Sequence, residues 1–454
     1  MRPARGGVWL LLALAPVLGV AQAPPPPSAP VAASEPAAAR GLYVGPTSCA
    51  GSLCHGSEVP RRDYDVLQNE YFTWFHRDRH RRAFEALLDE RSETIARHLR
   101  LGTPAAAARV CLDCHVLAPP PEVRTNLLEL EDGISCEACH GPASGWLEGH
   151  RSASWSYEDA VRAGMTDLRR LEVRAGLCLS CHQGAPGRGV DHDLIAAGHP
   201  ELVFELDNYT AQMPPHWLPF HERRDPPPGL RPSHGARAWA VGQVVSFGEG
   251  LAQLARRARA ERWPEFSELR CAGCHHSLAG ERWRRASYPD RPGLPRWSPA
   301  RWAVLRHLVD AFAPGARPEL DAEIARLAQQ TARLATPPAE VADTAERAGR
   351  GLAPVAARVE AASWDPAQVR RLLLAVAGDS AFLADADFQS AEQAYLAAHT
   401  LVAELIAADP RAAAGGLTGP LERMYQELGD PETFDRGRFL AQLGELERQA
   451  RRLP

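Results

Sequence analysis

The sequence contains no lysine, so every positively charged side chain other than histidine is an arginine, and no site can depend on a lysine amine. Neither sign of charge dominates, because 51 basic residues accompany 56 acidic ones. Proteins that bind nucleic acid carry a basic excess or patch, so this balance argues against a nucleic-acid partner. Beyond the N-terminus no stretch approaches the about 18 consecutive apolar residues of a membrane-spanning helix. We therefore expect no transmembrane helix in the mature chain.

The first residues have the pattern of an export signal. Two arginines precede a mainly apolar run over residues 8–20, and residues 21–23 (Ala-Gln-Ala) offer a small-residue cleavage site. We therefore expect a signal peptide over residues 1–23 and a periplasmic location. An uncleaved membrane anchor is the alternative, although the apolar run is short for a span.

All ten cysteines fall into five close pairs, and a histidine directly follows the second cysteine of every pair. Two residues separate the cysteines in four of the pairs, and four residues separate them in the first pair. In chain order we name them site one, Cys49, Cys54 and His55; site two, Cys111, Cys114 and His115; site three, Cys136, Cys139 and His140; site four, Cys178, Cys181 and His182; and site five, Cys271, Cys274 and His275.

The Cys-x-x-Cys-His pattern is typical of covalent c-type haem attachment. The two thiols form thioethers with the porphyrin, and the adjacent imidazole is held under the iron as its proximal ligand. Disulfides, zinc sites and a redox-active Cys-x-x-Cys motif are the competing interpretations. None of these requires a histidine after every pair. The pattern therefore predicts five covalently bound c-type haems.

Site one, CAGSLCH, departs from the pattern because its two cysteines enclose four residues. A longer loop can bulge while both sulfur atoms and His55 keep their places. Since four regular sites follow in the same chain, we predict that site one is a variant haem site. The alternative is an unattached cysteine pair that closes a disulfide.

Of the 17 histidines, twelve remain for the distal side of the irons. The distal candidates are His80, in an aromatic and arginine-rich segment expected to be helical, His150, and two histidines further on, His192 and His199, the latter in a Gly-His-Pro turn. Others are expected to be surface or packing residues, namely His76, His98, His216, His221, His234, His307 and His399.

This arrangement resembles the cytochrome c-554 family, whose haem packing is shared with hydroxylamine oxidoreductase and pentahaem nitrite reductases. The matching features are the Cys-Cys-His start, the His-bearing segment before site two, and GISCEACHGP at site three with a histidine shortly beyond; they cover residues 41–200. The resemblance implies that His80 binds the haem of site three and His150 the haem of site one. It leaves His199, with His192 as competitor, for site four or site five.

The resemblance also bears on activity. The second haem of the family is often five-coordinate, which makes site two the candidate for an open iron that binds small nitrogen or oxygen species. Pentahaem nitrite reductases typically use a lysine as proximal ligand of the catalytic haem, and this chain has none. The large hydroxylamine enzymes carry more haems than five sites supply. Both of these full activities are therefore disfavoured.

Cysteine distribution and periodicity predict the organisation of the chain. After the signal peptide we expect a Pro/Ala-rich tether over residues 24–40, a pentahaem cytochrome c domain over 41–310 and a helical C-terminal domain over 311–454. The fold class is mainly α, with little regular structure beyond short helices around the haems and a helical bundle at the C-terminus.

Two C-terminal segments carry the clearest helix signals. Asp365 and Pro366 form a helix start, followed by an apolar stripe of Val369, Leu372, Leu373 and Val376. Asp387 is the expected N-cap of the next helix, Pro410 its stop, and Ala394, Leu401 and Leu405 share one face.

The sequence thus predicts a periplasmic multihaem c-type cytochrome that transfers electrons between redox partners. These partners are either membrane-associated quinol oxidoreductases or other cytochromes. The alternative is a redox enzyme that reduces or oxidises a small nitrogen or other inorganic species at one open-coordination haem. No catalytic acid, base or nucleophile stands in an interpretable motif.

Overall fold

The computed structural model describes residues 41–62, 66–218, 234–275, 296–298, 300–384, 387–414, 416–431 and 433–453. The predicted signal peptide and tether lie outside these ranges. Over the described residues the chain is helical, and its only β pairing consists of isolated bridges, such as that between Tyr43 and Arg124. This confirms the predicted mainly α-helical fold class.

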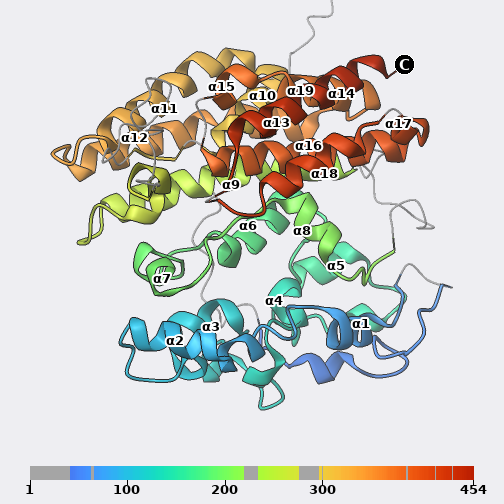
Figure 1. Ribbon diagram of the computed structural model, residues 1–454. Helices are drawn as coiled ribbons and strands as arrows, with labels where there is room; N and C mark the ends of the chain where they lie inside the picture. Colours follow the sequence, from blue (N-terminus) through green and yellow to red (C-terminus); the bar gives the residue numbers. More distant parts are fainter. Residues whose placement is uncertain are drawn as a thin grey trace, which may run out of the picture. The chain divides into compact units, whose positions relative to one another are not determined.

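Short helices and turns make up the part of the chain that carries sites one to four (Figure 1). The α-helices here are α1 (Glu70–Arg77), α2 (Glu90–His98), α3 (Arg109–His115), α4 (Cys136–His140), α5 (Tyr157–Arg162), α6 (Leu171–His182), α7 (His192–Ala197) and α8 (Leu206–Gln212). Sites two, three and four end α3, α4 and α6. The separate apolar cluster beside site two is small: Phe84, Leu87, Ala96, Ala105 and Val116.

Helix α1 is shorter than the sequence pattern predicted, because it ends before His80. Its C-cap, Asp78, has an extended backbone, and the Asp78 carboxylate accepts hydrogen bonds from the His80 backbone N–H (2.9 Å) and from His80 Nδ1 (3.0 Å). A side chain that bonds its own neighbouring backbone competes with helix continuation. His80 therefore lies in a turn after the helix.

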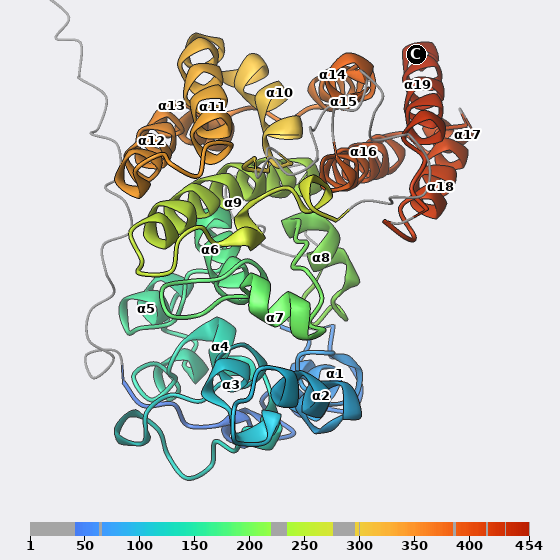
Figure 2. The ribbon, with the colours of Figure 1, turned by 60° about the vertical axis from the view of Figure 1, so that its left-hand side comes forward.

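The long helix α9 (His234–Ala258) lies between the cysteine-bearing helices and the C-terminal ones (Figures 1 and 2). It packs on α6 and α8 on one side, and on α10, α12, α13 and α16 on the other. Residues around its whole circumference are buried, with Trp239 fully buried. Such a helix belongs to the core of a large unit.

The C-terminal segment consists of packed helices (Figure 2). They are α10 (Trp302–Phe312), α11 (Arg317–Thr331), α12 (Pro338–Gly351), α13 (Ala353–Ala361), α14 (Pro366–Ala377), α15 (Ser380–Ala384), α16 (Phe388–Ala408), α17 (Arg411–Ala414), α18 (Thr418–Glu427) and α19 (Arg436–Arg452). Asp365 accepts from the Gln368 N–H (2.7 Å) and Asp387 from the Ser390 N–H (2.9 Å), so both predicted N-caps are confirmed. Both predicted apolar stripes are buried.

One apolar core joins α6, α8 and α9 to the helices beyond residue 310. It includes Leu179 of α6, Trp239 of α9, Leu305 of α10 and Leu401 of α16. The described residues, from 41 onward, belong to one compact unit. Within the described part of the chain, no helix has the length and apolar character needed to cross a bilayer. The domain boundary at residue 310 stays a prediction.

Candidate haem-attachment sites

All ten cysteines of the five sites lie in the described part of the chain as free thiols. Sites two, three and four are helical, whereas sites one and five are built from 3₁₀ and turn geometry. No group of three or more His, Cys, Asp or Glu side chains converges on a metal-sized centre among the residues that the structure describes.

One backbone hydrogen bond relates the histidine to the first cysteine of its site. In an α-helix the N–H of residue i bonds the carbonyl of residue i−4, which in Cys-x-x-Cys-His joins the histidine to the first cysteine. In site five this bond runs from the His275 N–H to the Cys271 carbonyl at 2.7 Å.

Site one keeps the same bond despite its two extra residues. The His55 N–H donates to the Cys49 carbonyl at 3.2 Å, and a turn closed by the Cys54 N–H and the Gly51 carbonyl (2.8 Å) takes up the added length. The chain therefore returns His55 to the first cysteine as in the regular sites, which supports the variant-site interpretation.

The rings of three histidine pairs lie at nearly the same separation. The ring centroids of His55 and His150 are 6.2 Å apart, those of His80 and His182 are 6.2 Å apart, and those of His192 and His275 are 6.3 Å apart. A metal–imidazole bond is roughly 2 Å long, so two imidazoles on opposite sides of one metal ion have centres roughly 6 Å apart. These pairs therefore have the spacing of two axial ligands of a single iron.

The hydrogen bonds of these rings leave the other ring nitrogen available. Nδ1 of His55 lies 2.9 Å from Glu70 Oε2, and Nδ1 of His80 lies 3.0 Å from Asp78 Oδ1. In other rings Nδ1 faces a backbone carbonyl, namely His115 with Ala83 (2.8 Å), His150 with Trp146 (3.3 Å), His199 with Pro200 (2.8 Å) and His216 with Pro214 (3.4 Å). A partner on Nδ1 fixes the tautomer and leaves Nε2 for a metal.

At sites two and three, the proximal histidine lies near a second histidine, and the charge of one imidazole lowers the pKa of the other. Burial lowers the pKa of His140 to about 4, and the nearby imidazole of His216 contributes to this shift. Burial likewise lowers the pKa of His199, with a smaller contribution from His115. A neutral imidazole is the form that binds a metal.

Helix α2 holds His199 in its predicted turn. Gly198 caps α7 with a φ of 119°, and its carbonyl accepts two hydrogen bonds from Arg91 of α2 (2.7 and 3.1 Å). His98 of α2 lies with Nδ1 3.2 Å from the Ala197 carbonyl. Two helices therefore fix the backbone on which His199 stands.

The ring positions of His80 and His192 can be compared with the assignments that the resemblance implied. His80 was assigned to site three, but its ring lies beside His182 of site four. Its backbone contacts the segment before site three, through a hydrogen bond from the Ile134 N–H to the His80 carbonyl (2.9 Å). His192, the competitor of His199, is the one whose ring lies beside site five.

His216 was expected to be an ordinary packing residue, and the structure places it near His140 of site three. It follows a Pro-Pro pair and stands in no motif. The sequence indicated only that another distal histidine was needed, because five irons with two axial imidazoles each require more distal histidines than the four candidates.

Attachment cysteines of different sites lie close together. A hydrogen bond between the Cys49 and Cys136 thiols joins sites one and three and lowers the pKa of Cys49. A hydrogen bond between Cys114 and Cys181 joins sites two and four and lowers the pKa of Cys181 to about 6. Site one is thus a neighbour of site three, and site two a neighbour of site four.

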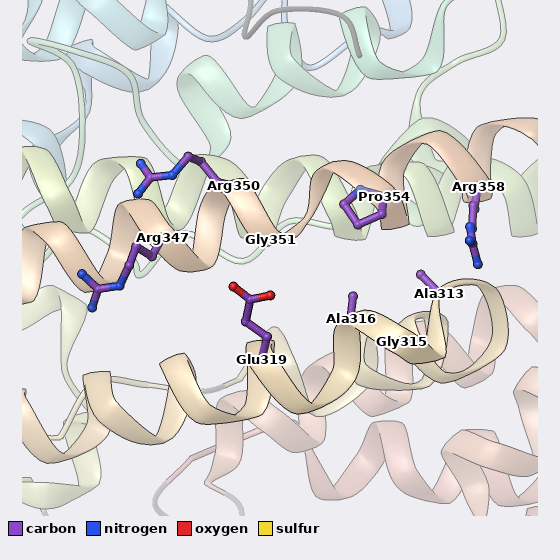
Figure 3. Close-up of a pocket in the computed structure, with 9 residues that line it drawn as sticks. All are labelled: Ala313, Gly315, Ala316, Glu319, Arg347, Arg350, Gly351, Pro354 and Arg358. Atoms are coloured by element: carbon purple, nitrogen blue, oxygen red, sulfur yellow. The ribbon is translucent and has the colours of Figure 1, made fainter. Parts of the chain in front are cut away.

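A cavity of about 660 Å³ lies away from the cysteines, between α11 and the α12–α13 pair (Figure 3). Glu319 lies on α11, Arg347 and Arg350 on α12, and Arg358 on α13 (Figure 3). Arg347 pairs with Glu323 (3.2 Å), and Arg358 donates to the Phe312 carbonyl (3.2 Å). Neither cysteine nor histidine lines this cavity, so it is separate from the haem chemistry.

Comparison with known proteins agrees with the chemistry of these sites. Residues 50–141 match the family model described as cytochrome c554 and c-prime. The match supports a c-type cytochrome, and hence covalently bound haem. It covers sites two and three and most of site one, and leaves Cys49 just outside. No curated protein and no solved structure matches the chain.

Proposed function

We propose that the chain is a pentahaem cytochrome that carries electrons, with two histidine ligands on each iron. The observation that carries the proposal is the spacing of the three imidazole pairs, 6.2–6.3 Å between ring centroids. This spacing supports His55 and His150 as ligands at site one, His182 and His80 at site four, and His275 and His192 at site five.

Electrostatic neighbours support the other two pairs. His199 lies near His115 and His216 lies near His140, and each of the two directs Nδ1 to a backbone carbonyl and so leaves Nε2 for a metal. We therefore assign His199 to site two and His216 to site three. In this assignment every proximal histidine has a distal partner. The predicted open iron of site two is therefore replaced by a six-coordinate one, and the carrier is favoured over the enzyme.

When bound, haem iron alternates between ferric and ferrous and so holds one electron at a time. The polypeptide brings the attachment sites close to one another. Cys49 lies beside Cys136, and Cys114 beside Cys181, so the attachment points of different haems would be neighbours. Helix α7 carries His192 for site five and is followed by His199 for site two. Because one segment serves both sites, site five is linked to site two, which supports electron transfer through all five proposed haems.

Export and partners belong to the same proposal. The N-terminal signal pattern supports a periplasmic location, where haem attachment to Cys-x-x-Cys-His takes place. The redox partners are then other cytochromes or membrane-associated quinol oxidoreductases. Nothing in the charge balance suggests a nucleic-acid partner.

The mass of the exported protein and the EPR spectrum of its oxidised form test this proposal. We expect a mass increment of five haems, low-spin ferric iron throughout, and no turnover of nitrite, hydroxylamine or nitric oxide. An increment of four haems would remove site one from the set. A high-spin signal with turnover of one of these substrates would favour the enzyme instead.

A further inference from the structure

The paired imidazoles differ in the charge of the group that faces Nδ1. A carboxylate faces His55 of site one, through Glu70, and His80 of site four, through Asp78. At site two the group facing His115 is the neutral carbonyl of Ala83. The same short segment, α1 and the turn after it, supplies all three acceptors.

Both carboxylates are held in place by bonds of their own. The second carboxylate oxygen of Glu70 accepts from the N–H groups of Leu67 (2.8 Å) and Gln68 (3.1 Å) at the start of α1. Asp78 is only 4% exposed and bonds both the backbone and the ring of His80. Glu70 and Asp78 lie at the two ends of α1, so the helix fixes the position of both carboxylates.

A carboxylate on Nδ1 strengthens an imidazole ligand. It draws the Nδ1 proton toward itself, which raises the basicity of the ring and stabilises the more positive, ferric iron. A carbonyl dipole does this to a smaller extent, because it carries no full charge. Partial burial increases the difference, since a charge acts more strongly where water is excluded.

We propose that Glu70 and Asp78 are positioning residues that lower the reduction potentials of the haems at sites one and four relative to the haem at site two. This inference rests on the proposed function, which places iron between the paired imidazoles. Under this inference, a haem at site two would hold an electron in preference to the haems at sites one and four.

The ring orientations provide a separate spectroscopic label for each of the two haems. The planes of His55 and His150 are 9° apart, whereas those of His80 and His182 are 87° apart. Nearly parallel imidazoles give low-spin ferric haem a rhombic EPR spectrum, and perpendicular ones give a highly anisotropic signal. Each signal can be followed while the potential is titrated.

The test compares the variants Asp78→Asn and Glu70→Gln with the wild type. Each amide keeps an oxygen that can accept the Nδ1 proton but removes the charge. We expect Asp78→Asn to move the midpoint of the highly anisotropic signal to higher potential and leave the rhombic one in place, and Glu70→Gln to do the reverse. Glu85→Gln, at an exposed carboxylate in the next turn of chain, is the control and should move neither.

Two different failures are distinguishable. If both signals are present but neither variant shifts its midpoint, the inference about the carboxylates is overturned and the ligand pairs stand. If the wild type lacks both a rhombic and a highly anisotropic low-spin signal, the ligand pairs themselves are overturned. Should Asp78→Asn lose its haem, Glu70→Gln carries the same test at site one, and Asp78→Glu should restore the low midpoint at site four.

Discussion

At the scale of single residues, the bond on Nδ1 determines which nitrogen of a histidine remains for a metal. His216 has the same arrangement as the histidines predicted from motifs, with Nδ1 facing a backbone carbonyl at 3.4 Å. Its influence on the pKa of His140 locates it near site three. These contacts distinguish it from an exposed histidine such as His76.

Under the proposed ligation, replacing His216 with alanine should convert the iron of site three from low-spin to high-spin. The reason is that the third haem would lose its distal imidazole while His140 and both thioethers remain. The EPR spectrum of the oxidised protein checks this. His76→Ala, at an exposed position of α1, is the matched control and should leave the spectrum unchanged. An unchanged spectrum for His216→Ala would exclude this residue as a ligand.

The motifs predict the attachment cysteines and proximal histidines because each site lies within five neighbouring residues, or seven at site one. Distal ligands come from elsewhere in the chain, so their assignment requires the fold. The family resemblance paired His80 with site three, and the backbone of His80 does contact the segment before that site. The turn closed by Asp78 is local, but the sequence around it does not indicate that the His80 ring lies beside His182 of site four.

At the scale of helices, end signals in the sequence were accurate where a side chain caps the backbone. Asp365 and Pro366 start α14, and Asp387 starts α16, as the sequence predicted. The pattern failed at α1 because the aromatic and arginine-rich run continues past Asp78, whereas the Asp78 side chain ends the helix. Apolar periodicity predicts which face of a helix is buried. It does not predict where a helix ends when the end depends on one side-chain hydrogen bond.

Replacing Asp365 with alanine should destabilise the protein by about 1 kcal/mol, because the N–H of Gln368 loses its capping acceptor. Denaturant unfolding followed by far-UV circular dichroism measures this free energy. Asp365→Asn retains a capping oxygen and should cost much less. Equal losses in the two variants would show that the cap contributes little.

Glu392 of α16 should make stability depend on pH. Burial raises the pKa of its carboxyl to about 8, and the nearby Glu201 and Asp387 add to this shift. The folded chain therefore keeps the proton that an unfolded chain releases near the ordinary pKa of 4.5. This contribution is fully present below pH 4.5 and is lost as the pH rises toward 8.

The variant Glu392→Gln should consequently gain melting temperature relative to the wild type as the pH increases from 4.5 to 8. A series of thermal melts across this range measures the difference. Glu422→Gln, at an exposed position of α18, is the control and should show a constant difference. A constant difference for Glu392→Gln as well would mean that Glu392 titrates normally.

At the scale of the whole molecule, one apolar core extends from α6, which ends in site four, to α19. Helix α9 connects the two parts by packing on both. The sequence predicted a helical domain beyond residue 310, packed against the cysteine-bearing part, because cysteines end before that point. Composition changes along a chain do not reveal whether the two parts share a core.

Replacing Leu401 with alanine should test this sharing. Leu401 is fully buried in α16, so the substitution should cost about 2–5 kcal/mol. If the core is shared, the unfolding transitions followed by the Soret band of the haems and by the far-UV signal of the helices should have the same, lowered midpoint. Independent domains would instead lower the helical midpoint and leave the Soret transition where it was.

The histidine pairs described above have a consequence for how the chain reaches its folded state. Under the proposed ligation each iron links two segments that are far apart in the sequence and thereby closes a long loop. A loop that is closed before the chain folds reduces the conformational freedom of the unfolded chain, as a disulfide does. Each iron then acts as a cross-link, so the polypeptide without its cofactors lacks the restraints that hold sites one, four and five together. Haem attachment and the folding of this region are in that case a single process.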